Sequence, residues 1–267
     1  MYSHSPTTYK LEIQKQTKDT VHKVEYDGTR YKGWQVQKST KDTIQGKLQS
    51  ILESMCGHEV MVIGSGRTDA GVHAKGQVAN FHMEDEYSME YIFEYINKYL
   101  PQDIAVTHIQ KVNERFHSRY NAISKTYMYR IHTGNVSNVF ERKYVYDYDM
   151  ELDVDKMKKA AKYLIGTHNF KAFCGNKKMK KSTVRTIYSI EIVKLPGEIQ
   201  IKYKGDGFLQ NMIRIMTGTL IEIGDGRRNP EEIVEILESK ERSQAGYTVP
   251  PQGLILEQVE YAKMGCN

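Results

Sequence analysis

Hydrophobic positions along the first half of the chain switch between periods of two and about 3.6 residues, which predicts alternating strands and amphipathic helices. Strands are predicted at residues 22–26, 59–63, 77–82 and 104–109. An apolar stripe at helical spacing runs from Ile44 to Met55 behind Thr43, a residue type that caps helices, and a second stripe begins after Ser88. The predicted order of elements is β-α-β-β-α-β.

The second half of the chain repeats this order with one helix added. Strands are predicted at residues 126–132, 186–193, 199–204 and 254–261. Helices are predicted near Asp153, from Phe208 to Ile223, and after Asn229. This repetition predicts an α+β fold of two tandem ferredoxin-like (βαββαβ) halves, with antiparallel sheets backed by helices and a basic cleft between them. We place the halves at residues 22–120 and 121–267, after a mobile leader at residues 1–21.

The composition is that of a globular protein with a small positive charge. The 267 residues include 38 Lys and Arg and 33 Asp and Glu, a formal net charge of +5 that suits a polyanionic partner. No apolar run reaches the roughly 18 residues of a membrane helix, and the polar first 21 residues lack the apolar core of a secretory signal. Cys56, Cys174 and Cys266 are far apart, so we expect reduced thiols, no structural zinc and a cytoplasmic location.

Residues 64–74 read GSGRTDAGVHA and place one acid and one arginine in a glycine-rich loop. Glycines allow tight turns that can hold the short side chain of Asp69 at the mouth of a cleft. Arg67 precedes Asp69 by two residues, a spacing that in an extended chain puts both on one face, where the guanidinium favours the ionised acid. An ionised carboxylate can act as nucleophile or base, although a short Gly-x-Gly-Arg-x-Asp run alone is more often a structural turn.

The whole run resembles the catalytic loop of the TruA family of pseudouridine synthases, whose Arg-Thr-Asp-Ala-Gly-Val-His-Ala signature carries the essential aspartate. Other segments resemble the same family in the same order. They read YDGTRYKGWQVQ at residues 26–37, NKYLPQDI at 97–104, FHSRY at 116–120, KTYMYR at 125–130, GDGFLQNMIR at 205–214 and PQGLIL at 251–256. The resemblance implies two halves around a catalytic cleft, isomerisation of uridine in RNA without metal or organic cofactor, and a homodimer that binds tRNA. We expect neither DNA nor a membrane as a partner.

The resemblance also assigns roles to single residues. Asp69 is expected to be catalytic, with Arg67 and Arg214 keeping it ionised. Arg214 falls at a largely buried helix position, where a charge needs an anionic partner, and the resemblance proposes Asp69 as that partner. Tyr127 aligns with the tyrosine that stacks on the target base, although a strand tyrosine is otherwise more often a packing residue. Leu254 belongs to a strand near the pocket.

Two segments have the composition of an RNA-binding surface. The first, at residues 26–37, mixes aromatic and cationic side chains that can stack on bases and hold phosphate, among them Arg30 and Trp34. Its alternative interpretation is a hairpin turn with Trp34 as a core anchor. The second is a basic loop, which either contacts phosphate or is only a solvated surface. Its cations are Lys177, Lys178, Lys180 and Lys181.

The expected substrate is the tRNA anticodon stem-loop, at positions 38–40 of the tRNA. Ribosomal or another RNA is an alternative, because Gln210 and Ile255 replace residues that relatives usually have near the pocket. A non-catalytic RNA-binding factor is a second alternative, but it would not need an acid beside phosphate. A metal-dependent hydrolase using Asp69 and His73 is a third, and it would lack further carboxylate ligands nearby.

Overall fold

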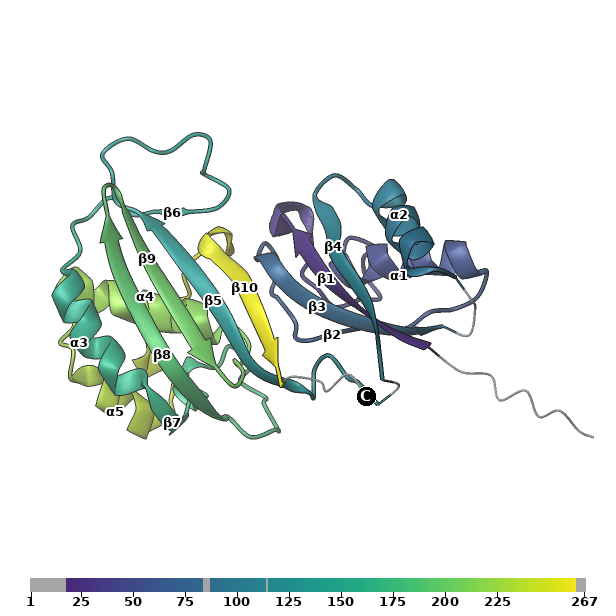
Figure 1. Cartoon of the computed structure of the whole chain (residues 1–267). Helices are drawn as coiled ribbons and strands as arrows, with labels where there is room; N and C mark the ends of the chain where they lie inside the picture. Colours follow the sequence, from purple (N-terminus) through teal and green to yellow (C-terminus); the bar gives the residue numbers. More distant parts are fainter. Residues whose placement is uncertain (1–17, 84–86, 114, 263–267) are drawn as a thin grey trace, which may run out of the picture.

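The computed structural model describes residues 18–83, 87–113 and 115–262. Within them one ten-stranded sheet passes through both halves of the chain, in the order β4-β1-β3-β10-β5-β9-β8-β7, with β2 paired to β3 and β6 to β5. Figure 1 shows the halves side by side, with β10 between β5 and the strands of the first half. The predicted α+β class is confirmed.

The first half has the predicted order of elements. They are β1 (Lys18–Tyr26), the 3-10 turn η1 (Gly28–Arg30), α1 (Ile44–Cys56), β2 (Val62–Gly64), β3 (His73–Met83), α2 (Met89–Tyr99) and β4 (Ile104–Val112). The hydroxyl of Thr43 accepts a hydrogen bond from the Gly46 N–H and so caps α1, and Ser88 caps α2 in the same way. Gly57 ends α1 in the left-handed conformation, at φ 76°. The strands pair antiparallel in the order β4-β1-β3-β2.

The second half pairs its strands in the order β10-β5-β9-β8, followed by β7. Its elements are β5 (Ala122–His132), β6 (Tyr146–Asp147), α3 (Val154–Leu164), β7 (Gly166–Asn169), η2 (Lys171–Phe173), β8 (Val184–Leu195), β9 (Glu198–Gly205), α4 (Met212–Gly224), α5 (Glu232–Ser239), η3 (Arg242–Gln244), η4 (Pro251–Gly253) and β10 (Leu254–Tyr261). Helix α4 is buried along nearly its whole length, and it lies beside α3 on the side of the sheet where Figure 1 also shows α5. It thereby holds the residues before it in a fixed position.

Strand β10 connects the halves. It runs antiparallel to β5 and parallel to β3, where Ile255 lies opposite His73 and Leu256 opposite Ala74. Buried side chains from both halves form one hydrophobic core. The glycine loop leads directly into β3, so this strand contact fixes the loop relative to the second half.

Several boundaries differ from the predicted ones. Strand β1 begins at Lys18, inside the range given to the leader, and residues 1–17 lie outside the described residues. Helix α4 begins at Met212 and not at Phe208, because the segment before it forms a loop. Strands β6 and β7 were not predicted, since they are short and polar. Among the described residues, no helix combines the length and the apolar character needed to cross a membrane.

Candidate active site

A cleft of about 840 Å³ lies between the two halves, a size that accommodates a small ligand or a nucleotide. The first half contributes the glycine loop with Arg67 and Asp69. The second half contributes Tyr127 from β5, Leu254 from β10 and the residues just before α4. The structure therefore brings together residues that are far apart in the sequence.

The glycine loop is held by close contacts with the segment before α1. The backbone N–H of Trp34 donates to the carbonyl oxygen of Thr68 at 3.1 Å. Gly33 makes this approach possible: its φ is +94°, and a Cβ there would lie 2.6 Å from that same oxygen. The Thr68 hydroxyl also bonds the phenol of buried Tyr26 at 2.8 Å. Asp69 thus follows a residue whose backbone and side chain are both anchored.

Arg214 reaches Asp69 from helix α4. Its Nη1 lies 3.8 Å from the Asp69 Oδ2, and both side chains are largely buried, at 15% and 29% exposed. The guanidinium is aimed by two further bonds, from Nε to the Val249 carbonyl at 2.8 Å and from Nη1 to the Asn211 Oδ1 at 2.9 Å. The predicted pairing of Arg214 with Asp69 is present.

The pKa of Asp69 is raised above that of an ordinary aspartate. Burial is the largest cause, because it penalises the charged form. Arg214 and the backbone N–H of Asn211 oppose the shift without cancelling it. The expectation that neighbouring arginines hold the acid ionised is therefore only partly met. The carboxylate lies in an environment that makes it a stronger base than a solvated one.

Arg67 does not pair with Asp69, although the structure describes both residues. Its Nε donates to the Gln35 Oε1 at 3.0 Å on the exposed rim of the cleft. The prediction assumed an extended chain, but residues 67–69 lie in an irregular loop between a bend at residues 65–66 and a turn at residues 70–71, where Gly71 has a φ of +78°. The same-face rule for alternate residues holds in a regular strand and does not apply there.

Tyr127 is buried on β5, at 7% exposed, and lines the cleft. Its ring meets that of Phe208 edge-on, with centroids 5.4 Å apart. The pKa of its phenol is raised, first by burial and then by the nearby Tyr26 and Asp69. The hydroxyl therefore stays protonated at neutral pH. The ring provides a fixed apolar wall close to Asp69.

The predicted RNA-contacting residues fall into different places. Trp34 is only 2% exposed and packs on the glycine loop, which favours the core-anchor alternative, but it also lines the cleft, and its contact with RNA stays a prediction. Arg30 is held by Asp103, with Nε 2.8 Å from Oδ2, outside the cleft lining among the described residues. Of the basic loop, Lys181 lines the cleft. Lys177, Lys178 and Lys180 are exposed nearby and stay predictions.

His73 does not form a metal site with Asp69. Its Nδ1 accepts a hydrogen bond from the Gly28 N–H at 3.0 Å and lies 3.2 Å from the Asp27 Oδ1. Burial lowers the pKa of His73. No group of three or more His, Cys, Asp or Glu residues in the described part of the chain could hold a metal ion.

Sequence reasoning missed three residues that shape the site. Asn211 adopts a left-handed φ of 58° just before α4 and holds Arg214. An asparagine directly before an apolar helical stripe was an available signal. Lys125 donates from Nζ to the Ser65 carbonyl at 2.7 Å, and Gln35 holds Arg67. These two depend on contacts between distant segments and left no local signal.

Ile255, expected near the pocket, is buried, and among the described residues it is not part of the cleft lining.

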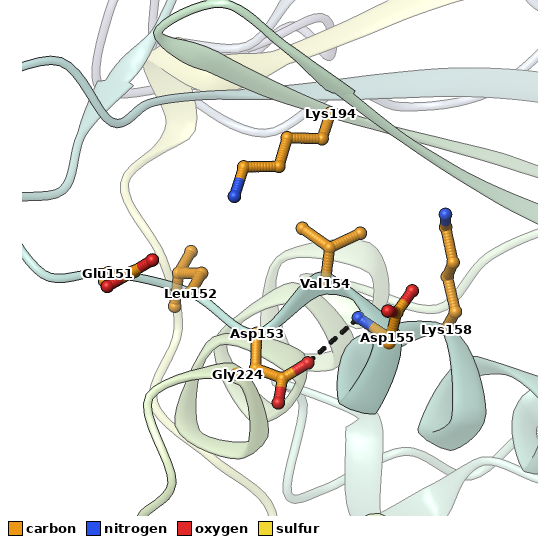
Figure 2. A pocket seen from close by; sticks show the side chains of 8 residues that line it. All are labelled: Glu151, Leu152, Asp153, Val154, Asp155, Lys158, Lys194 and Gly224. Atoms are coloured by element: carbon orange, nitrogen blue, oxygen red, sulfur yellow. Dashed lines mark hydrogen bonds between the residues drawn. The ribbon is translucent and has the colours of Figure 1, made fainter.

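A second hollow of about 550 Å³ lies at the start of α3, away from the cleft (Figure 2). Its acids are Glu151, Asp153 and Asp155, and its cations are Lys158, which lies beside Asp155 on α3, and Lys194 on β8. Asp153 already caps α3, since its Oδ1 accepts the Asp155 N–H at 3.1 Å and the Lys156 N–H at 3.0 Å. This acid is explained by the helix end.

Comparison with known proteins shows the family of this chain. Residues 23–121 and 160–262 match the family described as tRNA pseudouridine synthase. The chain is 49% identical over 238 residues to "tRNA pseudouridine synthase A" of Bacillus sp. (strain KSM-64), covering 89% of this chain and 97% of that protein. It is 46% identical, with the same coverage, to "tRNA pseudouridine synthase A 1" of Clostridium tetani (strain Massachusetts / E88). The chain belongs to the tRNA pseudouridine synthase family, which confirms the predicted resemblance.

The matches among solved structures include more distant ones. One described as "Crystal structure of the archaeal box H/ACA sRNP Nop10-Cbf5 complex" matches 87% of this chain and 58% of its own, at a TM-score of 0.35 and 10% identity. A likeness of this size supports no argument about the site.

Proposed function

We propose that this chain isomerises uridine to pseudouridine in tRNA, with Asp69 as the catalytic residue. The observation that carries the proposal is the position of Asp69, which lies in a cleft between the halves, beside the buried guanidinium of Arg214. The names of the relatives support tRNA as the substrate. The proposed target is a uridine of the anticodon stem-loop, as the TruA resemblance implies.

The reaction needs one carboxylate and no redox change. The N1–C1′ bond of the target uridine breaks, the uracil turns, and a C5–C1′ bond forms. The C5 proton leaves and N1 gains a proton, so the atoms balance. Asp69 acts either as nucleophile toward the sugar or as base toward a sugar proton, and Arg214 compensates the charge on the acid in the buried cleft. A target base must leave its stack to reach this depth.

Tyr127 contributes its ring to this chemistry. The raised pKa keeps its phenol neutral, which suits stacking on an extruded uracil. Leu254 lies on β10 at the same wall of the cleft and restricts where the base can lie. Arg67 lies on the rim of the cleft, bonded to Gln35, where RNA that enters the cleft can meet its guanidinium.

The finer expectations on the molecule stay proposals. We propose that the halves are tandem ferredoxin-like units, which their matching strand orders β4-β1-β3-β2 and β10-β5-β9-β8 support. We also propose a cytoplasmic homodimer that uses no cofactor. The TruA resemblance supports these statements. A measured molecular mass in solution tests the dimer.

The test is to map new pseudouridines at nucleotide resolution after incubating the purified chain with total RNA, with and without EDTA. We expect new sites in tRNA anticodon stem-loops that survive chelation. They should disappear with Asp69→Asn and remain with Asp42→Asn, a control at an exposed acid outside the cleft. Modification confined to ribosomal RNA would show that ribosomal RNA, and not tRNA, is the substrate. Loss of modification with EDTA would favour the metal-dependent alternative. Binding of RNA without modification would make the chain a binding factor.

A further inference from the structure

The segment from Phe116 to Tyr120 joins the two halves and alternates buried and outward side chains. Phe116 and Ser118 are buried, whereas His117, Arg119 and Tyr120 line the cleft that holds Asp69. The function proposed above gives no task to these three outward residues. Their chemistry, an aromatic pair beside a cation, is that of a surface that binds nucleotides.

The buried residues fix this segment to both halves. The Ser118 hydroxyl donates to the Ile63 carbonyl at 2.6 Å, and its N–H donates to the Asn80 Oδ1 at 2.9 Å. From β10, the Tyr261 hydroxyl donates to the Ser118 carbonyl at 2.7 Å. The Phe116 ring packs 5.2 Å from that of Tyr261. The outward side chains therefore stand on a backbone that is bonded to three strands.

Tyr120 is held in place although it is 77% exposed. Its ring lies against that of His117, with centroids 4.1 Å apart and an angle of 36° between the planes. The His117 Nδ1 accepts the backbone N–H groups of Arg119 at 3.1 Å and Tyr120 at 3.3 Å, so the imidazole cannot turn freely. An aromatic ring that faces solvent on so fixed a support does not stabilise the core. It is a preorganised stacking surface.

Three cations line the same cleft as this ring. They are Arg119, Lys125 and Arg185, and the pKa of Lys125 is lowered first by burial and then by the charges of the two nearby arginines. Asp206 is the nearby acid that acts in the opposite direction. Three cations that repel one another form a site for an anion such as phosphate.

We propose that Tyr120 and His117, with Arg119, form a subsite for the nucleotide adjoining the target uridine. The base of that nucleotide stacks on the Tyr120 ring, and its phosphate lies against Arg119 and the neighbouring cations. This subsite rests on the proposed function, because it holds the RNA while the target base is extruded toward Asp69. A base stacked there replaces the stacking that the RNA loses on extrusion.

Binding measurements test the subsite separately from the chemistry. All variants carry Asp69→Asn, so that the RNA stays unmodified, and the Kd for a fluorescent anticodon stem-loop is measured by anisotropy. Tyr120→Ala should raise the Kd by about tenfold, as expected for one lost stacking contact, and Tyr120→Phe by less than about twofold. Tyr188→Ala, at an exposed tyrosine of β8 outside the cleft, is the matched control and should leave the Kd unchanged.

An abasic nucleotide in the RNA supplies the decisive arm. The abasic nucleotide is placed on each side of the target uridine in turn. At the position whose base stacks on Tyr120, it should weaken binding to the chain that retains Tyr120 and have little further effect on the Tyr120→Ala variant. Equal losses for both chains at either neighbouring nucleotide would overturn the proposal. An unchanged Kd of the Tyr120→Ala variant would also overturn the proposal, even if that variant had a different oligomeric state. The pseudouridine map of the Asp69 chain reports on the proposed function independently of these results.

Discussion

The guanidinium of Arg214 lies 3.8 Å from the carboxylate of Asp69 and links helix α4 of the second half to the glycine loop of the first. Burial affects both partners in opposite ways: it raises the pKa of Asp69 and lowers that of Arg214, and each charge partly compensates the other. An unpaired charge on either side chain would be unfavourable in this buried cleft. The pair therefore controls the protonation state of the acid that we propose as the catalyst.

Replacing Arg214 should shift the pH dependence of the reaction. If ionised Asp69 is required, single-turnover activity falls as the pH decreases through its pKa, which lies above the ordinary aspartate value. Arg214→Met removes the charge that opposes this shift, so the acidic limb of the profile should move to higher pH. At neutral pH we expect activity to fall about 100-fold, as when one preorganised charged group is removed.

Arg130→Met is the control for this experiment. Arg130 is also partly buried and paired, with Nε 2.7 Å from the Glu198 Oε1, but it lies outside the described cleft lining. Its loss should change stability without moving the acidic limb. An acidic limb that stays in place in Arg214→Met would show that Arg214 does not control the ionisation of Asp69.

Lys125→Met should separate stability from activity. The Lys125 ammonium donates to the Ser65 carbonyl, and burial followed by the repulsion of Arg119 and Arg185 lowers its pKa to about 8. Between about pH 8 and 10.5 the folded chain binds fewer protons at Lys125 than the unfolded chain does, so the free energy of unfolding rises with pH in this range. Below about pH 8 the ammonium is charged in the folded chain and destabilises it.

Methionine keeps most of the Lys125 stem and removes this charge. We expect the melting temperature of Lys125→Met at pH 7 to equal or exceed that of the wild type, while turnover falls about tenfold because the glycine loop loses a charge-assisted hydrogen bond. Lys202→Met, at a β9 lysine paired with Glu257, is a control that should keep full turnover. A melting temperature well below wild type would contradict the argument.

Local patterns were sufficient to predict most of the fold. Periodicity and caps located both helices of the first half, since Thr43 and Ser88 act through hydrogen bonds to residues three positions away. They could not show that β10 pairs with β3, because that pairing joins distant segments through the backbone. The continuous sheet is therefore a property of the folded chain that no local pattern contains.

The site was predictable where the physics is local or where burial demands a partner. A charge within the apolar stripe of α4 predicts an anionic partner, and Asp69, which only the TruA resemblance named, lies beside Arg214. The partner of Arg67 was not predictable, because it depends on the turn of the loop. The bond from Arg214 to the Val249 carbonyl was also invisible, since any residue type provides such an oxygen.

Gly64→Ala should destabilise the chain and displace the glycine loop. A Cβ at Gly64 would lie 2.4 Å from the Cε2 atom of the buried Trp34 ring, which is rigid and cannot move aside. Overpacking of this kind costs about 1–3 kcal/mol of the free energy of unfolding. Chemical denaturation measures it, and activity should fall further than the loss of folded protein explains. Gly207→Ala, where the added carbon would lie at ordinary contact distances of 3.8 and 3.9 Å from the Arg185 Nε and Cδ atoms, should unfold like the wild type and serves as the control.

His22 makes the first half sensitive to acid. Its ring is 3% exposed and stacks on Phe81 at 4.6 Å, and neither ring nitrogen has a hydrogen-bond partner among the described residues. Burial, followed by the charge of His108, lowers its pKa to about 3. In the unfolded chain His22 therefore binds a proton below its ordinary pKa of 6.5, whereas in the folded chain it stays neutral down to about pH 3. Stability is retained above pH 6.5 and should fall by up to about 1.4 kcal/mol per pH unit below it.

His22→Leu removes both the buried polar atoms and the titration. Because an unsatisfied buried polar group costs about 1–3 kcal/mol, the variant should be more stable than the wild type at pH 7. The difference should grow as the pH is lowered from 6.5 to 4, since only the wild type must give up a proton on folding. Urea unfolding at a series of pH values measures both effects, and His168→Gln, at a β7 histidine bonded to the Ile165 carbonyl, should leave the slope unchanged. Parallel curves for wild type and His22→Leu would mean that another group controls the acid sensitivity.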